Sequence, residues 1–201
     1  MKRQLSLEEY RAIDLALFAA MLAIFEFLIV RFTTFSYYTV SLAAVIAAVV
    51  YMRWGWWGAI HAALAGILFC FYYSGLAPPD QTARWTQYII YVLGNLFSLA
   101  AVPVLKRVGE ERVRKSTAAS LLFSLSVILL MQGGRAVVAL VLRATTPAKA
   151  FGYFTADALS ILFTLVVTWI IRRLDGVFEE QRHYLARVQA EREQERSNTE
   201  Q

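Results

Sequence analysis

The sequence has few of the residues from which catalytic and metal sites are built. It contains one cysteine, Cys70, which excludes an internal disulfide and a cysteine-built metal site. Its two histidines, His61 and His183, offer no base that matches a serine nucleophile, and no H-E-x-x-H zinc motif occurs. A phosphate-binding loop of the G-x-x-x-x-G-K-[ST] type is also missing. We therefore predict a protein that is not an enzyme, that does not hydrolyse ATP itself, and that carries no metal or other cofactor.

Charge is scarce as well, and apolar residues gather in long runs. Charged side chains make up 17% of the chain and hydrophobic ones 58%, whereas a soluble domain has about 25% charged residues. Each helix that crosses a bilayer needs about 20 apolar residues. Six stretches approach this length: residues 12–31, 37–52, 54–74, 85–105, 117–142 and 150–172. The pattern predicts an all-α, polytopic membrane protein with six transmembrane helices within residues 1–173.

Residues 174–201 follow the last stretch as a short tail. Apolar side chains recur there at helical spacings and stop after residue 188: Leu174, Val177, Phe178, Leu185 and Val188. We predict a cytoplasmic helical tail, which is either a fraying extension of the last helix or a docking or signalling coiled coil.

Basic residues are divided unevenly between the two sides of the predicted bundle. With the N-terminus inside, the segments on the inner side hold Lys2, Arg3, Arg11, Arg53, Lys106, Arg107, Arg112, Arg114, Lys115, Arg172 and Arg173. The outer loops hold Arg31, Arg84, Arg143 and Lys149. This asymmetry predicts both termini in the cytoplasm of a prokaryote, with the chain in the plasma membrane. The net charge of +5 reflects this topology and calls for no nucleic-acid partner.

Arg135 lies inside a run of apolar residues that is long enough to cross a bilayer. Placing a guanidinium in hydrocarbon costs about 2.5–3.5 kcal/mol on insertion scales. Such a side chain faces the protein interior or a wet cavity and needs a polar partner. Glu26 and Asp157 are predicted at the same depth, in the outer thirds of the first and sixth spans, so either carboxylate can pair with it.

Other polar and aromatic residues approach the same level. Tyr88, Tyr91 and Asn95 share one face of the fourth span, and Tyr153, Asp157 and Ser160 share one face of the sixth. Two interpretations follow: an ion pair that locks the bundle, or a small-molecule pocket open to the outside. For the pocket we expect these residues: Glu26, Trp85, Tyr88, Tyr91, Asn95, Gln132, Arg135, Tyr153 and Asp157. The adjacent Gly133 and Gly134 predict a broken helix beside a cavity. Asp14 and His61 lie nearer the inner side, where we expect Asp14 to be hydrated and His61 to be packed.

The first span carries small residues at helical spacing. Ala12, Ala16 and Ala20 are four residues apart, and Ala19 and Ala23 form an adjacent pair. Small residues let membrane helices approach closely. These alanines therefore predict either packing within the bundle or a smooth surface for another membrane protein.

Six spans in about 200 residues, the A-x-x-x-A pattern of Ala16 and Ala20, and the small-residue segment 41–70 together resemble an S component. This is the substrate-binding membrane subunit of an energy-coupling factor (ECF) vitamin transporter. The resemblance implies that the alanine face contacts a transmembrane coupling subunit, that two cytoplasmic ATPases supply energy, and that the later spans bind a vitamin-like molecule. For that substrate, Arg135 suits a carboxylate or phosphate, and the tyrosines and Trp85 suit a flat ring.

Two other classes of function stay open. The chain could be a non-transporting scaffold that resembles the rod-shape-determining membrane subunit, or a sensor whose cytoplasmic tail carries the output. Deletion of residues 175–201 would abolish the function of such a protein and would have little effect on a transporter. A membrane enzyme is the third class, although no nucleophile or metal cluster supports it.

Overall fold

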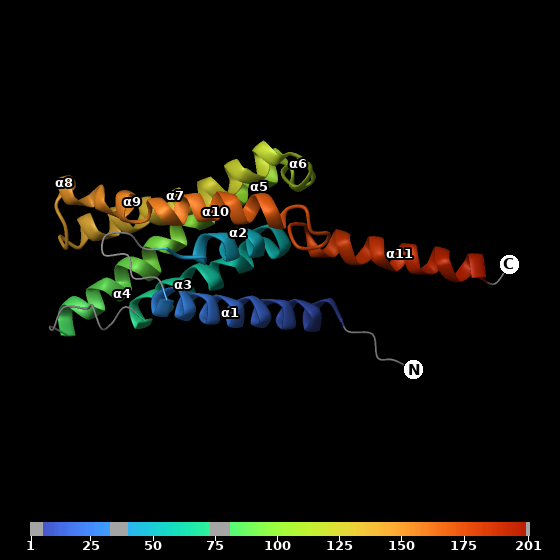
Figure 1. Cartoon of the computed structure of the whole chain (residues 1–201), viewed down its shortest axis with the longest axis horizontal. Helices are drawn as coiled ribbons and strands as arrows, with labels where there is room; N and C mark the ends of the chain where they lie inside the picture. The colour runs from blue at the N-terminus through green and yellow to red at the C-terminus, as the bar shows by residue number, and fades with distance from the viewer. Residues whose placement is uncertain (1–5, 33–39, 73–80, 200–201) are drawn as a thin grey trace.

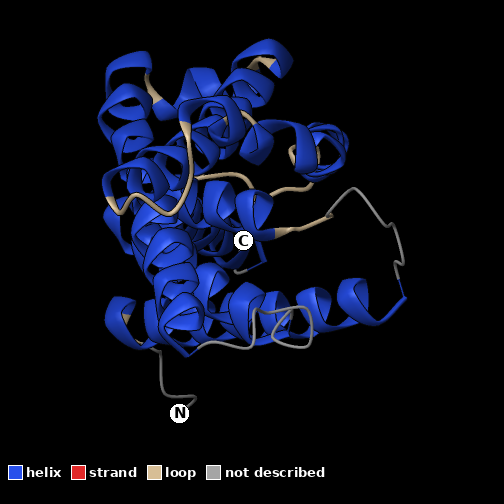
Figure 2. Ribbon diagram, turned by 90° about the vertical axis from the view of Figure 1, so that its left-hand side faces the viewer, coloured by secondary structure: helices blue, strands red, loops and turns tan. Residues whose placement is uncertain are grey.

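The computed structural model describes residues 6–32, 40–72 and 81–199 of the chain. All the elements within these ranges are helices (Figure 2), as the composition predicts. Five helical stretches of the described chain are long and apolar enough to cross a membrane: Leu7–Phe32, Ala43–Tyr72, Thr82–Val108, Thr117–Val141 and Pro147–Ile171. The chain is therefore an α-helical protein with several membrane-compatible spans.

The stretch Ala43–Tyr72 is two helices that pack against each other. Helix α2 (Ala43–Trp54) ends at Gly55, whose φ of +59° favours glycine, and a short 3₁₀ turn η1 (Gly55–Trp57) leads into α3 (Gly58–Tyr72). Helix α3 then runs back beside α2 (Figure 1). The predicted stretch 37–52 thus becomes a helix over Ala43–Trp54, and residues 37–39 lie outside the described residues.

Helix α2 forms the centre of the bundle. All of its 12 residues are buried, and it contacts α1 (Leu7–Phe32), α3, α7 (Thr117–Val141) and α10 (Ala158–Ile171). A helix of this length spans about 18 Å. The hydrophobic core therefore surrounds a short apolar helix that the longer helices enclose.

The stretch Thr82–Val108 changes its helical form before a proline. Helix α4 (Gln81–Leu96) passes into a 3₁₀ segment η3 (Phe97–Ala100) and then into α5 (Ala101–Val108). Pro103 lacks the N–H that would bond to the carbonyl of residue 99, which accounts for the irregular turn just before it. The short helix α6 (Glu110–Lys115) follows and leads to α7.

Helix α7 runs unbroken through Gly133 and Gly134. The predicted break at these glycines is therefore wrong. The break occurs in the last span instead, which divides into α8 (Pro147–Ala150), α9 (Gly152–Ala156) and α10, with a non-helical residue at Asp157. The irregular backbone at this depth thus belongs to the segment that carries the aspartate.

The chain does not continue as helix after Ile171. Residues 172–180 form turns, and the tail helix α11 (Gln181–Thr199) begins only at Gln181. The helical prediction for residues 174–180 is therefore wrong. The reason is that Phe178 is buried in the main core, with its ring 6.4 Å from that of Phe123, so the segment folds back onto the bundle. Helix α11 then projects away from the end of the bundle where α1 begins (Figure 1).

Candidate functional site

The buried arginine of α7 joins three helices. Arg135 donates from Nη1 to Asp157 Oδ2 at 2.7 Å and from Nε to Asn95 Oδ1 at 2.8 Å. Its guanidinium carbon lies 4.6 Å from the centre of the Tyr91 ring, which is a cation–π contact. Of the two pairings that the sequence allows, the structure has Arg135 with Asp157. Both partners are shielded, with side chains only 8% and 14% exposed, so the ion pair is buried.

Two glycines bring the backbones of α4 and α7 close enough for these contacts. A Cβ on Gly134 would lie 2.2 Å from the Gly94 carbonyl oxygen, and one on Gly94 would lie 2.6 Å from the Arg135 Cα. Neither position has space for a side chain. Gly133 differs, because the nearest atom to its Cβ would be 3.8 Å away, on the Phe154 ring. Gly94 and Gly134 therefore serve close helix packing.

Asn95 extends the network to a fourth helix. Its Nδ2 donates to the Ala62 carbonyl of α3 at 3.0 Å, while its Oδ1 accepts from Arg135. The Tyr91 ring stacks on Phe69 of α3 at 4.3 Å between ring centres. Asn95 and Arg135 thus have polar partners on neighbouring elements, which lowers the cost of keeping them in the membrane region.

Glu26 lies near this network without pairing with the arginine. Its Oε1 accepts from the Ser41 hydroxyl at 2.7 Å and from the Leu42 backbone N–H at 2.9 Å. The Ser41 N–H donates to Ser160 Oγ of α10 at 3.0 Å. Glu26 therefore holds the N-terminal end of α2, where a carboxylate complements the helix dipole. Ser160 was predicted on the face of the sixth span that carries Asp157, whereas Ser41 was not predicted, because a single serine in an apolar stretch gives no signal.

The other predicted pocket residues are dispersed. Trp85 is 62% exposed, and its ring lies 5.8 Å from that of Tyr88. Gln132 is fully buried on α7, and its amide atoms have no hydrogen-bond partner among the described residues. The Tyr153 ring lies 6.4 Å from that of Tyr91. Of the predicted set, the structure brings together Tyr91, Asn95, Arg135, Tyr153 and Asp157 and places Glu26 close by.

A pocket opens beside this cluster, at the end of the bundle away from α11. Its volume is about 260 Å³, slightly below the ~300 Å³ at which drug-sized sites begin. Tyr91, Tyr153 and Asp157 form part of its wall, together with Thr145 and Lys149 from the segment between α7 and α9. Arg135 does not line the pocket. It contacts Asp157 and Tyr91, which do. Thr145 and Lys149 were predicted only as parts of an outer loop, and the structure adds them to the pocket wall.

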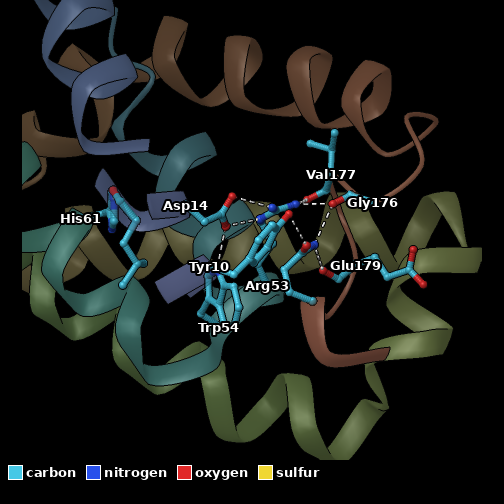
Figure 3. Close-up of polar contacts among 10 residues, drawn as sticks. Tyr10, Asp14, Arg53, Trp54, His61, Gly176, Val177 and Glu179 are labelled. Atoms are coloured by element: carbon cyan, nitrogen blue, oxygen red, sulfur yellow. Dashed lines mark hydrogen bonds and ion pairs between the residues drawn. The ribbon is translucent and has the colours of Figure 1, made fainter. Parts of the chain in front are cut away.

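A second polar cluster occupies the other end of the bundle (Figure 3). Arg53 donates to both carboxylate oxygens of Asp14, at 2.7 and 2.8 Å, and the Trp54 indole donates to Asp14 Oδ2 at 2.6 Å. Arg53 also donates to the carbonyl oxygens of Gly176 and Val177, the latter at 3.3 Å. The prediction that Asp14 is hydrated is therefore wrong. Its partner Arg53 had been interpreted only as a topology signal.

The same cluster fixes the start of the tail. Gln181 donates to the carbonyl oxygen of Gly176 at 2.8 Å, and Tyr10 donates to Gln181 Oε1 at 3.4 Å. His61 is buried, and its Nε2 lies 3.0 Å from the Leu15 carbonyl oxygen, so it is packed within the bundle. This region is a structural clasp between α1, α2 and residues 176–181.

A larger cavity lies beyond the clasp, between α5, α6 and α11. It measures about 710 Å³ and is lined mainly by charged residues. Several of these are paired with each other, including Glu179 with Arg114 and Arg187, each at 3.2 Å. The pocket beside Asp157 is smaller but has the aromatic walls expected of a small-molecule site. Within the described residues, no group of three or more His, Cys, Asp or Glu is placed to hold a metal ion.

The alanines of α1 differ in their exposure to the surroundings. Ala12, Ala16 and Ala20 are exposed, and Ala19 and Ala23 are partly buried. The opposite face of α1 carries the buried Asp14, Leu22 and Glu26. The A-x-x-x-A stripe therefore forms part of the outer surface of the bundle.

Comparison with known proteins gives no relative for this chain: no family model matches it, and neither a curated protein nor a solved structure is detectably similar.

Proposed function

We propose that the chain is the substrate-capturing subunit of an ECF-type importer, as its sequence resemblance implies. It would bind a vitamin-like small organic molecule from outside the cell and pass it inward with a coupling subunit and two ATPases. The observation that carries the proposal is the aromatic-walled pocket of Tyr91, Tyr153 and Asp157, which lies beside a buried arginine that is hydrogen-bonded to Asp157.

The contacts of Arg135 give it a positioning role in this proposal. Its guanidinium is already committed to Asp157, Asn95 and the Tyr91 ring. The residues that line the pocket include the two tyrosines, Asp157 and Lys149. A flat ring with polar substituents of either charge fits these walls. Arg135 orients the wall instead of contacting the substrate.

The rest of the proposal concerns the membrane. Six helices cross the bilayer when the α2–α3 pair counts as two crossings, and both termini then lie in the cytoplasm of a prokaryote. The exposed Ala12, Ala16 and Ala20 provide a surface on which a coupling subunit can pack closely.

Ligand binding tests the proposal directly. Purified protein in detergent is titrated with a panel of vitamins and their precursors by isothermal calorimetry. We expect one compound to bind saturably, and Tyr153→Ala to weaken it about tenfold through loss of an aromatic wall. Phe151→Ala is the matched control, because Phe151 is 67% exposed on the same segment and does not line the pocket.

Two results would refute the transporter proposal. One is a complete panel without a ligand. The other is a Tyr153→Ala variant that binds as tightly as Phe151→Ala does.

A sensor or scaffold is the second candidate, favoured by the clasp that fixes the tail. Because Phe178 and Gln181 are buried, deletion from residue 175 would expose the core and would not isolate the tail's role. Truncation after Ala190 keeps Arg187 on Glu179 and Tyr184 against Gly176. If this truncation abolishes the cellular phenotype while ligand binding persists, the tail carries the output. Unchanged activity favours the transporter.

A further inference from the structure

An apolar groove runs between α5 and α7 at the end of the bundle that carries α6. Its volume is about 410 Å³, which lies within the range of small-molecule sites. Val104 and Val108 of α5 face Leu122 and Phe123 of α7 across it. Three of these side chains are largely exposed, with Val104 at 55%, Val108 at 41% and Leu122 at 65%. On helices that cross a membrane, such a surface contacts lipid.

The length of the groove matches one leaflet. Its lining extends from Ser116, which caps the start of α7, to Ser126, a rise of ten residues or about 15 Å of helix. The hydrocarbon core of a bilayer is about 30 Å thick. The groove therefore reaches from the membrane surface to about the midplane.

A positively charged side chain, that of Arg112, lies at the end of the groove nearest the membrane surface. Arg112 of α6 lines it there, and its exposed guanidinium has no hydrogen bond or ion pair with any described residue. Its neighbours differ, since Lys115 pairs with Glu111 at 2.6 Å and Arg114 pairs with Glu179 at 3.2 Å. The segment 105–116 has five basic and two acidic residues, so the potential at this end is positive.

From this arrangement we propose that the groove binds one anionic phospholipid. One acyl chain lies between α5 and α7, and the phosphate pairs with Arg112. Charge complementarity selects the ligand, because a zwitterionic lipid fits the apolar groove equally well but brings no net negative charge to the guanidinium. The site is independent of the transport proposal and depends only on the chain's place in a membrane.

Native mass spectrometry of the full-length protein in detergent tests the site by titration with dioleoylphosphatidylglycerol and dioleoylphosphatidylcholine. We expect saturable binding of one phosphatidylglycerol in preference to phosphatidylcholine. Arg112→Gln should weaken phosphatidylglycerol binding about fivefold. Arg107→Gln is the matched control, since Arg107 is an exposed arginine of the same segment outside the groove lining and should bind as the wild type does. Leu122→Trp, at an exposed position that tolerates bulk, should reduce binding of both lipids.

The proposal is overturned if phosphatidylcholine binds as tightly as phosphatidylglycerol, or if Arg112→Gln behaves like Arg107→Gln. It is also overturned if Leu122→Trp keeps full lipid binding and instead prevents co-purification of a partner subunit, because the groove would then be a protein interface. A vitamin titration on the same variants separates these outcomes from a failure of the transport proposal.

Discussion

At the scale of single residues, the strongest constraint is the buried pair of Arg135 and Asp157. Removing one partner leaves the other charge buried without compensation, which costs about 3–5 kcal/mol. We expect Arg135→Gln and Asp157→Asn each to lower the melting temperature in detergent. Each loss should be more than half as large as the loss in the double variant. Arg143→Gln, at an exposed arginine, is the control. Strictly additive losses would show that the two side chains are not coupled.

The adjacent glycines of α7 give a sharp pair of substitutions. Gly134→Ala forces a Cβ against the Gly94 carbonyl oxygen, and overpacking of this kind costs about 1–3 kcal/mol. Gly133→Ala meets only ordinary contacts and gains about 0.5–1 kcal/mol of helix stability. Thermal unfolding should therefore move in opposite directions for the two variants. Equal shifts would mean that α4 and α7 do not approach at Gly94.

The partner of a buried charge could be predicted in part from the sequence. Arg135 stands out because no other guanidinium lies so deep in an apolar run, and depth alone reduced its partners to Glu26 and Asp157. Which of the two carboxylates pairs with Arg135 depends on the break in the helix at Asp157, and no sequence pattern predicted that break. Asp14 was misjudged because its partner Arg53 is 39 positions away, on a helix whose burial the sequence did not reveal.

At the scale of elements, the contact between Glu110 of α6 and Glu180, which precedes α11, should respond to pH. Burial, followed by the nearby Glu180 carboxylate, raises the pKa of the Glu110 carboxyl above its ordinary 4.5. The folded state thus holds this proton more tightly than the unfolded chain. The contribution of Glu110 to the free energy of unfolding is therefore fully present below pH 4.5 and is lost as the pH rises through the raised pKa.

Glu110→Gln should flatten this decrease when melting temperatures are compared between about pH 5 and pH 8. Glu111→Gln should not, because the Lys115 ammonium lowers the pKa of that exposed carboxyl. His183→Gln removes an ionisable neighbour of Glu180, since His183 Nδ1 lies 3.0 Å from Glu180 Oε2. A pH profile that survives in Glu110→Gln and disappears in His183→Gln would assign the effect to the histidine.

The outer stripe of α1 makes a separate prediction about assembly. Ala16→Leu adds bulk to an exposed surface, so the isolated protein should keep its melting temperature. If a coupling subunit packs closely on this face, co-purification with that subunit should fall strongly. Ala158→Leu, at an exposed alanine of α10, should leave co-purification intact. Equal recovery from both variants would remove α1 from the interface.

Long apolar runs were sufficient to locate the helices, but the irregular segments were not predictable in the same way. Helix α7 covers nearly all of its predicted stretch, because a run of this length has one favourable conformation in a membrane. The turns at 172–180 contain helix-compatible spacings, yet burial of Phe178 in the core overrides them. Tertiary contacts of this kind leave no periodic signal in the sequence.

At the scale of the whole molecule, the short central helix decides how the chain crosses the membrane. Counted as one stretch, Ala43–Tyr72 gives five spans and puts the two termini on opposite sides. Counted as the α2–α3 hairpin, it gives six crossings and puts them on the same side. The hairpin buries every residue of α2 between longer helices, and such enclosure compensates for its length of about 18 Å.

Single cysteines in a Cys70→Ser background distinguish these topologies in intact cells. Cysteines at Ser6, Glu111 and Ala190 should react with a membrane-impermeant maleimide only after permeabilisation if the chain has the proposed six crossings, which put all three positions in the cytoplasm. A cysteine at Thr145 should react without permeabilisation, since it lies beside the pocket at the opposite end. Trp56 in the α2–α3 turn, which is 51% exposed, is the deciding position. For six crossings, a cysteine at position 56 should not be labelled in intact cells. If only one of positions 6 and 190 is labelled in intact cells, the chain has five crossings.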